Sequence, residues 1–114
     1  MYWADGFGGV ITVTDTEGTI VYMNEAGLKL FSRFSGGKSL IGKSLFDCHK
    51  PESVNKIKEL MKNRTTRSYT TVRGRVKKFF HQAPWYNENK EFAGYLELIW
   101  EVGDIPHFDR DRGE

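Results

Sequence analysis

The chain has 114 residues, of which 39% are hydrophobic and 28% are charged, and its net charge is +2. This length suits one domain with its own core, and the composition is that of a globular rather than a disordered protein. No apolar run approaches the roughly 18 to 20 residues of a membrane span, and the first residues lack the pattern of a secretory signal. The single cysteine, Cys48, excludes an internal disulfide and is typical of a reducing compartment, so we expect a cytoplasmic protein.

Charged residues are unevenly distributed along the chain. Residues 56–78 contain nine bases and one acid, whereas residues 87–114 contain eight acids and three bases. Such runs usually form solvated surfaces, and the alternative is a patch for an acidic partner or for nucleic acid. The basic run lacks the interleaved aromatic residues of a base-stacking platform, so the sequence does not favour a nucleic-acid partner.

The order of apolar and turn-forming residues predicts a hairpin, short helices, one longer helix and then three strands. Asn24 is suited to cap a helix because its side chain can accept from free backbone N–H groups, and Pro51 suits the first position of the longer helix. The expected elements are strands over 10–14 and 19–23, helical segments over 25–31, 44–49 and 51–62, strands over 68–73, 76–86 and 91–102, and loops over 34–43 and 63–67. Successive hairpins with segregated helices predict an antiparallel sheet and an α+β fold.

Three motifs in this order resemble those of a PAS (Per-Arnt-Sim) domain. They are GVITVTDTEGTIVYMNEA at residues 9–26, LIGKSL at 40–45 and APWYNENKEFAGYLEL at 83–98. The resemblance implies a five-stranded antiparallel sheet, with short helices and one longer helix on one face enclosing a small cavity. It implies an opposite face that binds a partner. We expect an N-terminal cap segment at residues 1–8, a PAS domain at 9–102 and a polar tail at 103–114.

The resemblance also implies a function in signal transduction. Members of this family sense ligands, light, oxygen or redox state and pass the signal to an attached effector. The tail is too short for an effector domain, so we expect a sensory or regulatory domain that acts through association with a separate effector protein, unless the natural chain is longer. A ligand-free interaction domain with a filled core is the alternative. We expect no enzyme, because the sequence lacks a phosphate-binding loop and a nucleophile with an evident base.

The cofactor-binding branches of the family can be compared residue by residue. The light-sensing branch needs a reactive Cys where this chain has Leu45 and a flavin-facing Gln where it has Leu96, so we expect no flavin photoadduct. Haem sensors usually supply a His from the longer helix, which has none here, and His49 stands just before it. A non-covalent haem is therefore a weaker alternative, and c-type attachment is excluded because the Cys-x-x-Cys-His motif is absent. The scattered histidines also lack the spacing of a metal site.

Strand residues alternate between faces, and this parity divides the last two strands into a cavity face and a partner face. The all-apolar set of the last strand is expected to face the helices, together with Gln82, which must pair with Tyr69 or with a ligand. The predicted ligand-binding residues are Phe80, Gln82, Leu96, Leu98 and Trp100, with Tyr69 and His49 at the rim. The other face is unusually apolar, which predicts a homodimer. Its predicted interface residues are Phe79, His81, Tyr95 and Ile99, with Tyr2 and Trp3 alongside.

Overall fold

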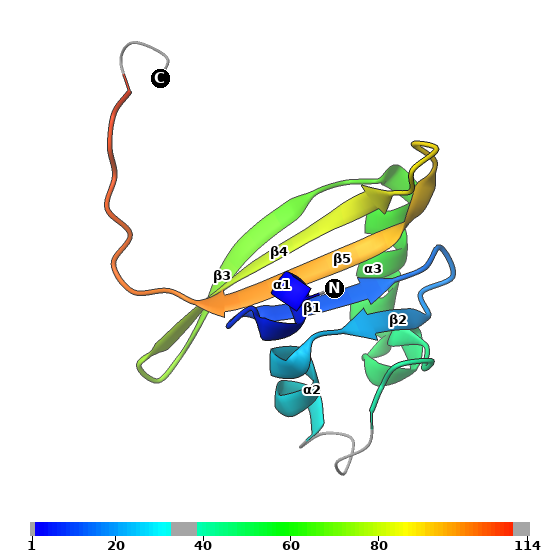
Figure 1. Ribbon diagram of the computed structural model, residues 1–114, viewed down its shortest axis with the longest axis horizontal. Helices are drawn as coiled ribbons and strands as arrows, with labels where there is room; N and C mark the ends of the chain where they lie inside the picture. The colour runs from blue at the N-terminus through cyan, green and yellow to red at the C-terminus, as the bar shows by residue number, and fades with distance from the viewer. Residues whose placement is uncertain (1, 33–38, 111–114) are drawn as a thin grey trace.

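The computed structural model describes residues 2–32 and 39–110 and contains a five-stranded antiparallel sheet with helices beside it (Figure 1). The elements are α1 (Tyr2–Gly6), β1 (Val10–Thr14), β2 (Ile20–Met23), α2 (Glu25–Ser32), the 3₁₀ helix η1 (Leu45–Cys48), α3 (Pro51–Asn63), β3 (Arg67–Arg73), β4 (Val76–Tyr86) and β5 (Phe92–Glu101). This order confirms the predicted α+β fold, and the predicted elements agree with the observed ones to within one residue at each end. Helix α1 was not predicted as an element. Part of the predicted loop over residues 34–43 falls outside the described residues.

The strand order in the sheet is β2-β1-β5-β4-β3, and each neighbouring pair is antiparallel. The first and last strands of the chain therefore lie side by side in the middle. The turn between β1 and β2 forms around Asp15, whose Oδ1 accepts hydrogen bonds from the backbone N–H groups of Glu17 and Thr19, both at 2.9 Å. Gly18 follows with a φ of 83°, a conformation that glycine adopts without steric cost.

Asn24 joins three parts of the chain and is completely buried. Its Oδ1 accepts from the N–H of Gly27 at 3.0 Å, which is the predicted helix cap, and also from the N–H of Ile11 at 3.0 Å. Its Nδ2 donates to the carbonyl of Gly9 at 2.8 Å. One side chain thus fixes the start of α2 against β1 and against the segment that enters β1.

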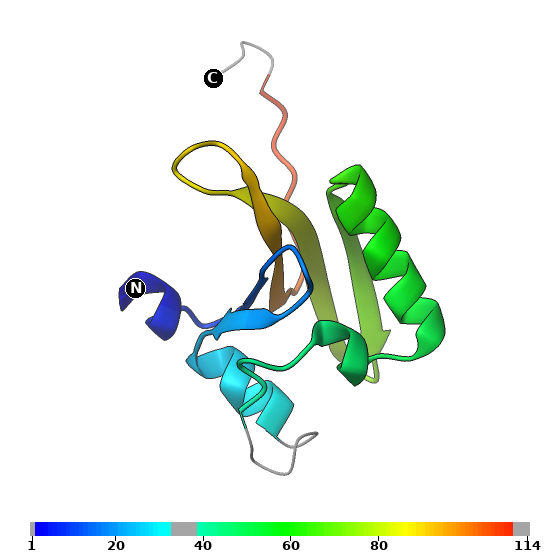
Figure 2. The same cartoon turned by 90° about the vertical axis from the view of Figure 1, so that its right-hand side faces the viewer.

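The helices lie on opposite sides of the sheet (Figure 2). Helix α1 is on one side, and α3 is on the other. Pro51 begins α3, and Arg64 ends it in the left-handed conformation with a φ of 53°. The hydroxyl of Tyr95, on β5, donates to the Leu60 carbonyl at 2.6 Å and also contacts the Thr65 carbonyl, so it holds the end of α3 on the sheet. Within residues 2–32 and 39–110, none of the helices is long and apolar enough to cross a bilayer.

The pairing of β4 with β5 contains a β-bulge near the turn that joins them. The register shifts between Trp85 and Tyr86, which leaves Ala93 as an extra residue on β5. The next residue, Gly94, has a φ of 142°, and a Cβ placed there would lie 2.0 Å from the carbonyl oxygen of Thr14. This position therefore requires glycine, both for its backbone conformation and for the close approach of β1.

Candidate functional site

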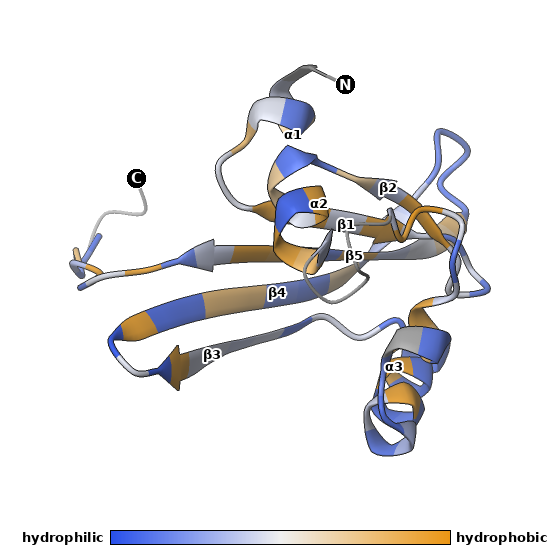
Figure 3. Ribbon diagram, turned by 90° about the horizontal axis from the view of Figure 1, so that it is seen from below, coloured by the Kyte–Doolittle hydropathy of each residue, from blue (hydrophilic) through white to orange (hydrophobic). Residues whose placement is uncertain are grey.

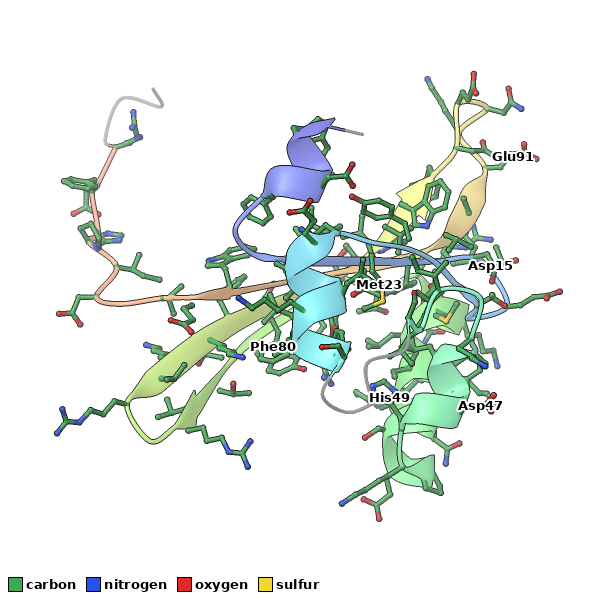
Figure 4. All side chains as sticks on the ribbon, turned by 60° about the horizontal axis from the view of Figure 1, so that its bottom comes forward. Asp15, Met23, Asp47, His49, Phe80 and Glu91 are labelled. Carbon is green, nitrogen blue, oxygen red and sulfur yellow. The ribbon has the colours of Figure 1, made fainter. Side chains whose placement is uncertain are left out.

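A cavity of about 1190 Å³ lies between one face of the sheet and the elements α2, η1 and α3. Residues of β1, β3, β4 and β5 form its floor, and residues of β2 and the helices form its walls. Figure 4 shows Met23 of β2, Phe80 of β4 and His49, which follows η1, around this space. Segments that are far apart in the sequence thus contribute to one site.

Four of the seven predicted ligand-binding residues line this cavity. Phe80 and Gln82 contribute from β4, and Tyr69 contributes from β3. His49 is exposed, and its Nδ1 lies 2.9 Å from the carbonyl oxygen of Leu45, which places the imidazole at the mouth. The predicted positions of these four residues are confirmed, and their role in ligand binding stays a prediction.

The structure corrects the prediction for the last strand, whose predicted cavity residues lie on the opposite face of the sheet: Leu96, Leu98 and Trp100. The bulge at Ala93 is the physical reason. Without it, Gln82 would pair with Leu96, whereas the bulge moves the register by one residue and pairs Gln82 with Glu97. A shift of one residue exchanges the two faces of a strand, so the cavity face of β5 carries Glu97, Ile99 and Glu101 instead.

Four polar residues form a row across the cavity floor, one from each of four neighbouring strands. Thr12 of β1 pairs with Glu97 of β5, Glu97 pairs with Gln82 of β4, and Gln82 pairs with Arg67 of β3. All four line the cavity. Directly paired residues have Cβ atoms about 4.5–5.5 Å apart, so these side chains are neighbours. We call Thr12, Glu97, Gln82 and Arg67 the polar row.

The polar row contains one internal hydrogen bond between side chains and several groups without a partner. Gln82 Nε2 donates to Glu97 Oε2 at 2.7 Å. Burial raises the pKa of Glu97, although the hydrogen bond from Gln82 and the positive charge of Arg67 act in the opposite direction. Among residues 2–32 and 39–110, the buried atoms Thr12 Oγ1, Gln82 Oε1 and Arg67 Nε find no hydrogen-bond partner.

The next row along the floor is apolar and aromatic. Val10 pairs with Ile99, Ile99 pairs with Phe80, and Phe80 pairs with Tyr69. The rings of Tyr69 and Phe80 are stacked, with centroids 4.8 Å apart and an interplanar angle of 6°. The guanidinium carbon of Arg67 lies 4.6 Å from the centre of the Tyr69 ring. The cavity thus offers an apolar surface directly beside the polar row.

Among the described residues that line the cavity, acidic and basic side chains are equal in number. The acidic lining residues are Asp47, Glu52, Glu97 and Glu101, and the basic ones are Lys56, Arg67, Arg73 and Lys78. In the part of the chain that the structure describes, no group of three or more His, Cys, Asp or Glu side chains could hold a metal ion. The lining therefore favours hydrogen bonding to a ligand of low net charge.

The opposite face of β4 and β5 is largely apolar. We call it the outer face, and its residues on these two strands are Lys77, Phe79, His81, Ala83, Trp85, Leu96, Leu98 and Trp100. The rings of Phe79 and Trp100 are stacked with centroids 5.0 Å apart, and His81 Nδ1 lies 2.7 Å from the hydroxyl oxygen of Ser68. Hydrophilic and hydrophobic bands follow one another along β4 (Figure 3), and each band, such as Lys77-Lys78 or Phe79-Phe80, contains residues of both faces.

The residues predicted for the interface lie on the outer face in β4 but not in β5, and the interface itself stays a prediction. Phe79 and His81 do lie on the outer face. Tyr95 and Ile99 lie on the cavity side and are only 6% and 5% exposed, because the same bulge turns them inward. Trp3, in α1, is 70% exposed. The side chain of Tyr2 falls outside what the structure describes.

Sequence reasoning missed three members of the polar row, Thr12, Arg67 and Glu97. The hydrophobicity of β5 alone favours its apolar residues, Leu96, Leu98 and Trp100, as the ones that face the cavity, and this interpretation is wrong. The motif residue Gly94 was a usable signal, because an isolated glycine inside a strand often marks a bulge. A bulge there would have placed Glu97 opposite Gln82 from the sequence.

Comparisons with known proteins agree with this geometry. A family model described as a PAS domain matches residues 8–99. The PAS domain of BvgS from Bordetella pertussis superposes with a TM-score of 0.65 at 20% identity, over 90% of this chain and 83% of that one. The Aer2 receptor of Vibrio cholerae, described as a dual PAS-heme oxygen sensor, gives 0.59 at 20% identity, over 83% of this chain and 95% of that one. A PAS domain of an HTR-like protein from Haloarcula marismortui gives 0.59 at 15% identity, over 88% and 86%. A search of curated protein sequences finds no match.

Proposed function

The chain belongs to the PAS domain family, and we propose that it is a sensory or regulatory domain that binds a small molecule in the cavity and acts through association with other proteins. In this proposal the chain forms a homodimer through its outer face and passes its signal to a separate effector protein. The proposal places it in the cytoplasm, which the single cysteine supports. Membership of the PAS family itself indicates a sensory domain of the kind found in signal transduction.

The observation that carries the proposal is the cavity with its unpartnered polar floor. Small-molecule sites are usually clefts of roughly 300–1,000 Å³ with a few placed polar groups among apolar ones. The cavity here reaches about 1190 Å³, and three buried polar atoms of its floor lack a partner. In a core filled by apolar side chains, each such atom would cost about 1–3 kcal/mol. This supports ligand binding over the alternative of a ligand-free interaction domain.

The two faces of β4 and β5 provide a route from the cavity to the partner surface. Gln82 faces the cavity and its neighbour His81 faces outward, and Glu97 stands in the same relation to Leu98. A ligand that repositions Gln82 or Glu97 therefore also shifts the backbone that carries the outer face. Such a ligand changes association only to the extent that it binds the associated and free forms with different affinity.

The outer face supports the association part of the proposal. A sheet face in contact with water normally carries polar residues, whereas this one carries Phe79, Leu96, Leu98 and Trp100. These side chains are half-buried within the chain, and apolar patches that stay partly open to solvent often mark interaction sites. Trp3 is exposed on α1, on the side of the sheet away from α3 (Figure 2), and would extend the same surface in a dimer.

Native mass spectrometry of the purified protein, combined with an absorbance spectrum, tests the proposal. We expect a retained small molecule, or binding of a compound from a metabolite library that perturbs cavity residues, without the visible absorption of haem or flavin. Stoichiometric haem or flavin would overturn the cofactor prediction, which rests on Leu45 and the absence of His from α3, since Leu96 lies on the outer face. If no compound binds and the domain still associates, the ligand-free interaction domain is the better account.

A further inference from the structure

The polar row presents hydrogen-bonding groups that no other described residue satisfies. Thr12 is only 6% exposed, yet its Oγ1 finds no hydrogen-bond partner among the described residues. The buried atoms Gln82 Oε1 and Arg67 Nε find none there either. These atoms belong to three strands, and their side chains all line the cavity. Buried side-chain polar atoms are nearly always hydrogen-bonded in folded proteins. Three unsatisfied polar atoms in one row therefore point to a ligand or to water.

The hydrogen-bonding character of two of these atoms is fixed by the chemistry of their groups. The amide nitrogen of Gln82 donates to Glu97 Oε2 at 2.7 Å, so the free Oε1 of Gln82 is an acceptor. The Nε–H of Arg67 is always a donor. Gln82 and Arg67 are direct cross-strand partners, so a free acceptor and a free donor lie beside each other. The hydroxyl of Thr12 can serve as either.

We propose that the polar row recognises a neutral molecule that carries an N–H donor and a C=O acceptor on the same edge, as cyclic amides and ureas do. The N–H of such a ligand donates to Gln82 Oε1, and its C=O accepts from Arg67 Nε. A carboxylate offers no donor to Gln82, and an ammonium group offers no acceptor to Arg67. This inference rests on the proposed function, because it names the ligand class for the same cavity.

The surroundings of the polar row suit the rest of such a ligand. Phe80 and Ile99 lie in the adjacent row on the same floor and provide an apolar surface for a ring. Water molecules could satisfy the orphan atoms one at a time. A ligand that presents both groups on one rigid edge replaces these waters together while it buries its apolar body.

A matched pair of compounds tests the inference. Hydrocarbostyril is a bicyclic lactam whose N–H and C=O share an edge, and N-methylhydrocarbostyril keeps the ring system and the C=O but carries a methyl group in place of the N–H hydrogen. We expect an amide NMR titration of the isotope-labelled protein to show millimolar or tighter binding of the lactam, with the largest shifts at the polar row. A site built to bond an N–H rejects an analogue that lacks it, so the N-methyl compound should bind at least about tenfold more weakly. Hydrocinnamate and phenylpropylamine serve as charged comparators and should bind more weakly than the lactam.

Variants assign the effect to the polar row. Gln82→Leu should reduce lactam binding to the level of the N-methyl compound, and Arg67→Lys, which keeps the charge and loses the Nε donor, should weaken it as well. Thr70→Val is the control, because Thr70 is exposed and pairs with Phe79 of the outer face. The same spectra report whether each variant is folded.

The outcomes separate this inference from the proposed function. If the two lactams bind equally, or a charged comparator binds more tightly at the polar row, the ligand class is wrong and the cavity remains a binding site. The inference is also wrong if the lactam shifts no cavity amide while other compounds do. If no compound of any class binds, the proposed function fails with it.

Discussion

Replacing Asn24 tests whether one buried amide holds the N-terminal half of the domain together. In Asn24→Ala, the N–H groups of Ile11 and Gly27 lose an acceptor, and the carbonyl of Gly9 loses a donor. All three residues are buried, so water cannot easily replace the amide. We expect α2 to detach from β1 before the rest of the sheet opens.

The size of the effect follows from these contacts. Loss of a helix cap costs about 1 kcal/mol, and each buried backbone group left without a partner costs about 1–3 kcal/mol. The sum for Asn24→Ala is about 3–7 kcal/mol, a large part of the roughly 5–15 kcal/mol by which a domain of this kind is stable. Asn24→Asp keeps the acceptor and loses the donor, and we expect an intermediate loss.

Urea unfolding followed by circular dichroism measures the free energy of unfolding of each variant. Asn87 provides a matched control, because its Oδ1 also accepts from two backbone N–H groups, those of Asn89 and Glu91, in an exposed turn. Asn87→Ala should cost about 1 kcal/mol or less, since water replaces the lost amide. If Asn24→Ala is no more destabilising than Asn87→Ala, the reasoning from burial is refuted.

Three further predictions concern β5. Burial raises the pKa of the Glu97 carboxyl group above the ordinary 4.5. The folded state therefore binds the carboxyl proton more tightly than the unfolded state does. As a result, the free energy of unfolding falls as the pH rises from 4.5 towards neutrality. Glu97→Gln should flatten that dependence and stabilise the domain most at neutral pH in urea titrations, and an unchanged pH profile would contradict this. Gly94→Ala should cost several kcal/mol of stability or prevent folding, because its Cβ would lie 2.0 Å from a backbone oxygen. Gly103→Ala, with open space around the Cβ, is the control and should leave the melting temperature unchanged. Equal melting temperatures of the two variants would show that the backbone at Gly94 yields. In sedimentation experiments, Leu98→Glu should shift the protein from dimer to monomer while it stays folded. Ile99→Glu should unfold the domain, because Ile99 is only 5% exposed. A wild-type protein that sediments as a monomer would remove the homodimer from the proposal.

Local chemistry made most of the fold predictable. Asp15 and Gly18 form the expected turn, Asn24 caps the expected helix, and Pro51 begins the longer helix. Each of these residues acts on backbone groups a few positions away, so its effect can be worked out without knowing the rest of the structure. The parity of β4 was also correct from the sequence, because that strand is regular from Val76 to Trp85.

The candidate site was only half predictable, because it depends on how β5 is aligned with its neighbours. The sequence by itself determined the family, the order of the elements and the cavity residues on β3 and β4. Tertiary structure alone decided that Glu97 completes the polar row and that Leu96 and Leu98 belong to the outer face. The bulge at Ala93 arises where Gly94 passes within contact of the backbone of β1, a strand that lies some eighty residues earlier in the chain. A contact between such distant segments sets the register. Because strand side chains alternate with a period of two, that one residue determines which set faces the cavity and which lies on the outer face.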